Sequence, residues 1–302
     1  MEKNLPNFFV ELLKKQYEEN TVNSILDGYN VKRKTTLRVN TIKTTAEEVK
    51  RKLQENQIDF EQVAWSKDAL IIKNANESDI KKLSIYENGD IYLQSLSSML
   101  PPIILEPKPD KDILDMAAAP GGKTTQIAAL TQNKSHITAC EMNNIRIEKL
   151  KYNVEKQGAN YVYIMQKDSR NIDDFFSFDQ ILLDSPCSGS GTINIEDKNL
   201  DKYFTTKLIE KSTKSQYMLL KKALRILKPG HEMVYSTCSI LKEENEEIVK
   251  RVLKEVKAEI VPIEFEGMEM LPLLSVNLEG TVCVCPTKYY EGFYIAKIRR
   301  LR

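Results

Sequence analysis

The chain has too few cysteines and histidines for several classes of protein. Five cysteines in 302 residues do not make a disulfide framework, and an odd number indicates free thiols. His136 and His231 are the only histidines, which excludes a multi-histidine metal site and makes a Cys/His zinc site difficult to assemble. We therefore expect reduced cysteines and no metal.

Long apolar runs and an excess of one charge are also lacking. No apolar stretch reaches the roughly 18 residues that would suggest a membrane span, and no charged-then-apolar leader opens the chain. The 44 basic and 43 acidic side chains nearly cancel, so net charge gives no evidence for a nucleic-acid partner. We expect a cytoplasmic monomer with no membrane partner, and any nucleic-acid contact must depend on local charge.

What the sequence does contain are two blocks of different pattern. Residues 1–100 are charged and mixed, with a helix that opens at Thr45 and has Glu48 at capping-box spacing, which predicts a small α+β domain. In residues 101–302, short apolar strands alternate with helices, which predicts a doubly wound, Rossmann-like α/β sheet. The strands are expected at residues 112–116, 136–141, 161–166, 180–184, 233–237, 259–264 and 292–298. The helices are expected at residues 124–130, 145–157, 215–227 and 244–256.

The first strand of the second block is followed by a turn of small residues, DMAAAPGGKT. Such a turn lets a ligand approach the backbone closely, and doubly wound sheets bind ligands beyond the carboxyl ends of their strands. A phosphate-binding P-loop would need glycine where the chain has Ala117, so a nucleotide hydrolase is disfavoured. We expect a nucleotide-like cofactor here.

Acids end the next three strands: Glu141, Asp168 and Asp184. A single acid at such a place is commonly a solvated surface group, but a series at successive strand ends indicates a site. The first of them is placed to accept hydrogen bonds from ribose hydroxyls.

Two cysteines follow the fourth and fifth strands. Cys187 lies in DSPCSGSG and Cys238 in YSTCS, so both are expected at the same edge of the sheet and could share one cavity. Free cysteine is also among the most buried residue types, and we interpret Cys140, Cys283 and Cys285 as packing residues.

These motifs resemble the RNA cytosine-5 methyltransferases of the RsmB/Nol/Sun type. The matching pieces, from about residue 30 onward, are LRVNTIK, YLQSLSSML, DMAAAPGGKT, DSPCSGSG and YSTCS. The chain departs from the family pattern at Met116 (often cysteine), at Glu141 (usually aspartate) and in its closing segment, which lacks a histidine often found there.

The resemblance implies S-adenosyl-L-methionine as cofactor, and RNA, either ribosomal or transfer, as partner. Glu141 would hold the ribose hydroxyls, Asp168 the adenine edge, and Asp184 both cofactor and target base. Cys238 would attack the cytosine and Cys187 would assist release. The cofactor's amino-acid part would be surrounded by Ala117, Ala118, Ala119, Pro120, Gly121, Gly122 and Lys123.

Candidate RNA contacts lie in the first block. Lys32, Arg33 and Lys34 form a basic cluster suited to phosphates, although a solvated loop explains them equally well. Arg38 and Asn40 belong to the matching LRVN piece, and we expect them to bind RNA.

Two other functions fit parts of the pattern. A DNA cytosine-5 methyltransferase would use Cys187 as the attacking thiol and could dispense with Cys238. An RNA-binding assembly factor with an inactive methyltransferase fold would bind the cofactor without transferring a methyl group.

Overall fold

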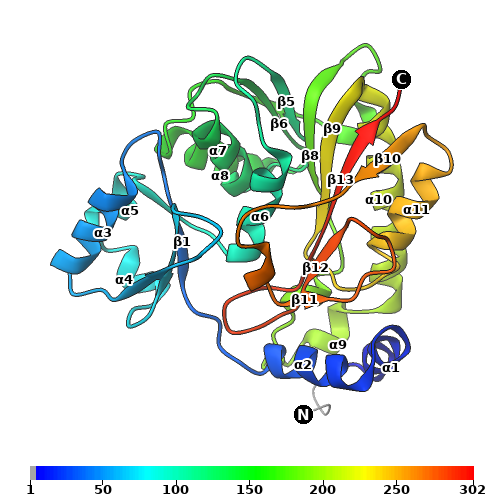
Figure 1. Ribbon diagram of the computed structural model, residues 1–302, viewed down its shortest axis with the longest axis horizontal. Coiled ribbons are helices and arrows are strands. Elements are labelled where there is room, and N and C mark those ends of the chain that lie inside the picture. The colour runs from blue at the N-terminus through cyan, green and yellow to red at the C-terminus, as the bar shows by residue number, and fades with distance from the viewer. Residues whose placement is uncertain (1–4) are drawn as a thin grey trace.

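The computed structural model describes residues 5–302, which form two β-sheets of different kinds (Figure 1). The first block of sequence contains a four-stranded sheet, and the second contains a nine-stranded sheet. In the large sheet, parallel strands alternate along the chain with helices. The predicted fold, a doubly wound α/β sheet with a small N-terminal α+β unit, is therefore confirmed.

The small sheet is antiparallel, in the order β2-β3-β1-β4. Helix α3 (Ala46–Glu55) packs on it through Val49 and Leu53. The Oγ1 atom of Thr45 accepts a hydrogen bond from the N–H of Glu48 at 3.2 Å, so the helix begins as predicted. The strands are β1 (Thr36–Val39), β2 (Phe60–Gln62), β3 (Ala69–Ile72) and β4 (Ile91–Leu93), and two short helices are α4 (Glu77–Ile80) and α5 (Ser84–Glu87).

The large sheet has the order β11-β12-β13-β9-β8-β5-β6-β7, with β10 paired to β13. Strands β5 to β9 are parallel, and β13 runs antiparallel to β9. Strand β5 lies between β6 and β8, so the order of winding reverses there, which is where such sheets bind ligands. The strands are β5 (Asp112–Asp115), β6 (His136–Glu141), β7 (Val162–Gln166), β8 (Phe178–Asp184), β9 (Leu227–Thr237), β10 (Ala258–Val261), β11 (Leu273–Leu274), β12 (Val282–Val284) and β13 (Phe293–Arg300).

Alternate side chains of the central strands belong to two different cores. Leu114 and Tyr235 pack in the core that α10 and α11 cover, whereas their neighbours Ile113 and Val234 pack in the core that α6 and α7 cover. Both faces of these strands are therefore buried, as is usual in a parallel sheet. The helices are α6 (Leu96–Leu105), α7 (Gly122–Leu130), α8 (Asn144–Lys156), α9 (Leu200–Tyr203), α10 (Thr206–Ile226) and α11 (Glu246–Leu253).

Helices α1 (Asn7–Gln16) and α2 (Glu19–Tyr29) lie against the large sheet's loops. The Tyr17 hydroxyl donates a hydrogen bond to the carbonyl of Ile240 at 2.6 Å, and the Tyr29 hydroxyl donates to that of Ser190 at 2.5 Å. These two helices therefore lie with the second block in space, although the sequence prediction groups residues 1–100 in one domain.

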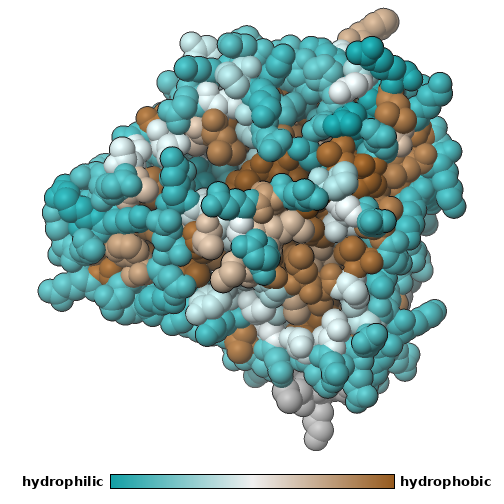
Figure 2. Space-filling model, viewed as in Figure 1, coloured by the Kyte–Doolittle hydropathy of each residue, from teal (hydrophilic) through white to brown (hydrophobic). Residues whose placement is uncertain are grey.

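Within residues 5–302, no helix is both long and apolar enough to cross a membrane. On the face drawn in Figure 2, hydrophilic residues cover the edges and apolar residues gather near the middle, around the positions of β12 and β13 in Figure 1. The apolar residues of this face thus form a central group and not a continuous band.

Candidate active site

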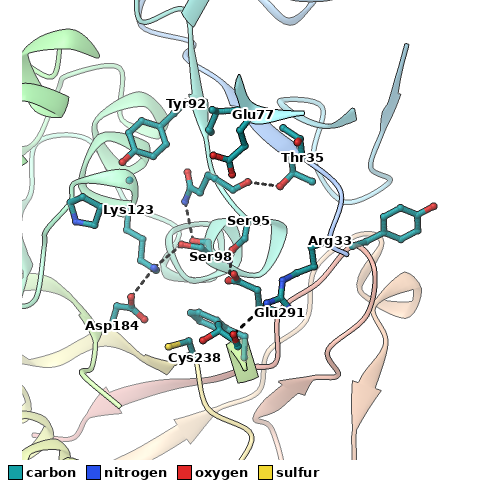
Figure 3. Close-up of a pocket in the computed structure, with 18 of the residues that line it drawn as sticks. Arg33, Thr35, Glu77, Tyr92, Ser95, Ser98, Lys123, Asp184, Cys238 and Glu291 are labelled. Carbon is teal, nitrogen blue, oxygen red and sulfur yellow. Dashed lines mark hydrogen bonds and ion pairs between the residues drawn. The ribbon is translucent and has the colours of Figure 1, made fainter. Parts of the chain in front are cut away.

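A cavity of about 850 Å³ lies at the carboxyl ends of the parallel strands, where the small and large sheets face each other (Figure 3). The first block contributes lining residues such as Thr35, Tyr92 and Ser95. The second block contributes Lys123 and Asp184. The cavity therefore lies at the place that the winding of the sheet predicts for a ligand.

The turn between β5 and α7 forms one wall of this cavity. Gly121 has a φ of 107°, a conformation that residues with a side chain rarely adopt. A Cβ atom at Gly122 would lie only 3.1 Å from the ring of Tyr92. The small residues therefore keep the wall open. Of the cofactor-binding residues predicted in this turn, the cavity is lined by Ala117, Ala118, Ala119, Pro120, Gly122 and Lys123, but not by Gly121.

Lys123 is held by two oxygen atoms in the cavity wall. Its Nζ atom lies 2.7 Å from Oδ2 of Asp184 and donates a hydrogen bond to Oγ of Ser98 at 2.7 Å. Burial lowers the pKa of Lys123, but the nearby carboxylate of Asp184 raises it by more. The pKa of Lys123 therefore lies above its ordinary value. The other Asp184 oxygen accepts a hydrogen bond from the Ser236 hydroxyl at 2.8 Å. The structure thus fixes Asp184 between the first turn of α7 and the end of β9.

The two predicted catalytic cysteines meet. The Sγ atoms of Cys187 and Cys238 lie 3.1 Å apart, although the residues come from loops after different strands. Cys238 lines the cavity, whereas Cys187 is not among the lining residues. The hydrogen bond with Cys238, together with burial, raises the pKa of the Cys187 thiol. Cys140, Cys283 and Cys285 are buried elsewhere, as the packing interpretation predicts.

Main-chain contacts fix the two cysteine loops to each other. The N–H of Gly191 donates a hydrogen bond to the carbonyl of Cys238 at 3.0 Å, and the N–H of Gly292 donates to the carbonyl of Gly191 at 2.8 Å. A Cβ atom at Gly191 would lie 1.9 Å from the carbonyl oxygen of Gly292. This approach requires glycine, because a side chain would push the Cys187 loop away from the segment that precedes β13.

A buried acid that the sequence analysis missed also joins these loops. The carboxylate of Glu244 accepts hydrogen bonds from the N–H and hydroxyl of Ser188, at 2.8 and 2.5 Å, and from the hydroxyl of Ser239 at 2.6 Å. Gln216 donates a further bond at 3.2 Å. Burial raises the pKa of Glu244. Because Ser188 follows Cys187 and Ser239 follows Cys238, Glu244 joins the residues next to both thiols.

Asp115 is a second acid that the prediction of site residues left out. It lines the cavity, and its Oδ2 atom accepts a hydrogen bond from the Thr124 hydroxyl at 2.7 Å. Its Oδ1 atom is buried and has no hydrogen-bond partner among the residues described. Burial raises the pKa of Asp115 to about 6. Its position at the start of the small-residue turn was the signal that could have identified it.

Glu141 and Asp168 lie at the same edge of the sheet but are not among the cavity's lining residues. Oε1 of Glu141 accepts hydrogen bonds from the N–H groups of Met142 and Asn143, both at 2.9 Å, and Oε2 lies 3.3 Å from Arg146. Both oxygens of Asp168 bond the guanidinium of Arg170, which lowers the pKa of Asp168. Within residues 5–302, no hydrogen bond or ion pair joins either carboxylate to a residue that lines the cavity.

The predicted RNA-binding residues fall into two groups. Lys32, Arg33 and Lys34 line the cavity and are exposed or half-buried. Arg38 and Asn40 are buried, with 4% and 0% of their surface exposed. The prediction that these two contact RNA needs correction, because buried side chains cannot reach a phosphate.

Arg38 and Asn40 instead connect the small sheet to the large one. The guanidinium of Arg38 donates hydrogen bonds to Gln94 and to Thr125 of α7, both at 3.1 Å. The amide of Asn40 donates to the carbonyl of Gln157, just after α8, at 2.8 Å. Burial lowers the pKa of Arg38 to about 10, so it remains charged at neutral pH. Arg38 in β1 and Asn40 just after it therefore hold the small sheet against α7 and the end of α8.

Comparison with known protein families matches both parts of the chain. Residues 102–299 match the model of the family "16S rRNA methyltransferase RsmB/F", and residues 5–79 match a ferredoxin-like domain of RsmF/B-like methyltransferases. A ribosomal RNA small subunit methyltransferase F from Shewanella sp. (strain ANA-3) is 35% identical over 276 residues, which is 88% of this chain and 56% of that protein. The chain thus spans little more than half the length of such relatives.

Solved structures agree with these matches. A methyltransferase homolog from Pyrococcus horikoshii is 30% identical, with a TM-score of 0.82 over 98% of this chain and 100% of that chain. The structure of NSun6 from the same organism with SFG has a TM-score of 0.88 over the whole of both chains at 23% identity, and so supports the fold alone.

Proposed function

The chain belongs to the 16S rRNA methyltransferase RsmB/F family, and on this premise we propose that it methylates carbon 5 of a cytosine in small-subunit ribosomal RNA. The observation that carries the proposal is the pair of sulfur atoms 3.1 Å apart, from Cys187 and Cys238. Cys238 lines the same cavity as Lys123 and Asp184. A single cavity would therefore bring together a thiol, a methyl donor and the target base.

The cavity suits S-adenosyl-L-methionine, which supplies a methyl group on a positively charged sulfur. Ala117 to Pro120, Gly122 and Lys123 line one wall of it, and Oδ1 of Asp115 is a buried acceptor that lacks a partner within the described chain. Such an acceptor fits the ammonium group of the cofactor's amino-acid part. Glu141 and Asp168, at the ends of β6 and β7, would bind the ribose hydroxyls and the adenine edge.

A thiolate is needed because carbon 5 of cytosine is a poor nucleophile. Addition of the Cys238 thiolate to carbon 6 makes carbon 5 enamine-like, and carbon 5 then accepts the methyl group. Loss of the carbon-5 proton and of the thiolate restores the ring. The position of Cys238 at the cavity wall supports its role as the attacking group. Cys187, whose Sγ atom lies 3.1 Å from that of Cys238, assists the release step.

Asp184 would orient the base during these steps. Its carboxylate already accepts hydrogen bonds from Lys123 and Ser236, which hold it at the cavity wall. From there it can accept a hydrogen bond from the cytosine amino group or ring nitrogen. The target base must first leave its stack, because a thiol cannot reach carbon 6 within a helix.

RNA phosphates would bind the cationic segment of Lys32, Arg33 and Lys34, which lines the same cavity. Arg and Lys side chains hold phosphates without reading sequence. This segment would therefore position the strand, while the cavity receives the base.

The proposal is tested by bisulfite sequencing of RNA from cells with and without the gene, and from cells with a Cys238→Ala variant. We expect one 5-methylcytosine in small-subunit ribosomal RNA to disappear in both mutants. A lost position in transfer RNA would change the substrate but keep the chemistry, whereas an unchanged methylation map would refute the proposal.

A further inference from the structure

A second cavity opens beside the first. It has a volume of about 400 Å³ and is lined by residues 29–33 and 193–196. Lys32 and Arg33 line this cavity and also the larger one. The two cavities therefore share a wall that carries two positive charges.

The shared wall is attached to the loop that carries Cys187. Nη2 of Arg33 donates a hydrogen bond to the carbonyl of Thr192 at 3.5 Å, and the Tyr29 hydroxyl donates to the carbonyl of Ser190. Thr192 lines the larger cavity and Ile193 lines the smaller one. One peptide bond thus separates the two linings, so a ligand in the second cavity would lie close to the thiol loop.

The second cavity offers both apolar and polar groups. The Nδ2 atom of Asn30 donates to a carbonyl of α2, and Oδ1 of Asn194 accepts from the N–H of Glu196 at 3.0 Å. Across residues 5–302, no hydrogen bond uses Oδ1 of Asn30, Nδ2 of Asn194 or the Glu196 carboxylate. Besides the cationic groups of Lys32 and Arg33, the lining therefore offers a ligand the acceptor oxygens of Asn30 and Glu196 and the donor Nδ2 of Asn194. The apolar lining comes from Val31, Ile193 and Ile195.

We propose that the second cavity holds the nucleotide next to the target cytosine, an inference that rests on the proposed function. Two neighbouring bases are joined by one phosphodiester, and the two cavities are joined by one cationic wall. Lys32 and Arg33 bind that phosphate, while Val31 and Ile193 contact the faces of the second base. Because the Oδ1 atom of Asn30 and the carboxylate of Glu196 can accept hydrogen bonds from an exocyclic amino group, a base that carries one binds better than uracil.

The test uses the full chain and a synthetic RNA that spans the cytosine mapped by bisulfite sequencing. The neighbouring base on the 5′ or the 3′ side is either removed, leaving an abasic nucleotide, or replaced by uracil. We expect the abasic change on one side to lower kcat/KM about tenfold, the scale of one lost base contact. Uracil on that side lowers it severalfold.

Two variants connect this effect to the cavity. Glu196→Ala removes an acceptor and is expected to reduce the discrimination against uracil, whereas Asp201→Ala, exposed on the same chain segment but outside both cavities, retains it. Val31 is exposed and lines the second cavity, so the larger side chain of Val31→Trp is expected to fill that cavity. The variant should therefore raise KM for intact RNA. It should not raise KM for the abasic RNA, which has no base to place there.

The outcomes separate the two proposals. If the protein methylates the intact RNA but neither abasic change lowers kcat/KM, the second cavity does not hold a neighbouring nucleotide and the proposed function stands. An equal rise of KM for both RNAs in Val31→Trp contradicts the inference in the same way. If no RNA is methylated at all, the proposed function fails, and the inference fails with it.

Discussion

The loops after β8 and β9 each contain one cysteine, but the two thiols lie in different surroundings. Cys238 lines the large cavity, whereas Cys187 is not among its lining residues and has a raised pKa. The same hydrogen-bonded acid, Glu244, joins the residue that follows each cysteine. The proposed difference in role therefore rests on which thiol lines the cavity and not on residue type, and four experiments test it.

The largest effect is expected for Cys238→Ala. Removing the attacking thiol should lower the rate of methyl transfer by on the order of 10⁴-fold or more, as for other nucleophiles that act in a unit. The measurement is transfer of a labelled methyl group to RNA, with Cys140→Ala, a buried cysteine outside the site, as control. Substantial remaining activity would assign the attack to Cys187 and favour the DNA-type mechanism.

Cys187→Ala should also stop turnover, but at a later step. Attack by Cys238 still occurs while release fails, so RNA should stay attached to the protein in a complex that resists denaturant. The measurement is a denaturing gel, and the Cys187→Ala/Cys238→Ala double variant should show no such band. Normal turnover without an adduct would mean that Cys187 has no part in release.

Loss of Glu244 should weaken both loops. Glu244→Ala leaves several buried donors without an acceptor, which should lower the free energy of unfolding by about 3 kcal/mol. Glu244→Gln keeps the shape and part of the bonding, so about half that loss is expected, and exposed Glu247→Ala should be near neutral. Urea unfolding measures all three; an unchanged Glu244→Ala stability would show that the loops do not depend on this acid.

The smallest effect is a difference in alkylation by iodoacetamide. Only the thiolate reacts, so the raised pKa of Cys187 should keep its labelling low at pH 7.5 and increase it as the pH rises. Cys238, which lines the cavity, should be labelled faster than Cys187 at pH 7.5. Peptide mass spectrometry measures both rates, and faster labelling of Cys187 would reverse the comparison.

The large sheet could be predicted well because its strands are short apolar runs at regular spacing. The segment that became β6 was predicted with the bounds it has, His136–Glu141. Helix α10 begins at Thr206, earlier than the predicted residue 215, because its first turns are polar and carry little periodic signal. Strand β11 was not predicted, since a segment of two residues contains too little pattern.

The site was predicted less completely, because burial depends on contacts across the two sheets. Arg38 and Asn40 look like surface residues in the sequence, but the small sheet faces α7 and the end of α8 at this point. Glu244 lies in the run EENE, which is typical of a solvated helix start. Only the hydrogen bonds that the Ser188 and Ser239 hydroxyls donate to Glu244 show that this acid lies in the interior.

The main-chain contact at Gly191 has a consequence for the order of events in the proposed reaction. The hydrogen bond from the N–H of Gly191 to the carbonyl of Cys238 holds the two cysteine loops together. Cys238 lines the cavity and Cys187 does not, so a pyrimidine bound there would meet Cys238 first and Cys187 afterwards. The path of the polypeptide would thus set the order in which two chemically identical side chains act.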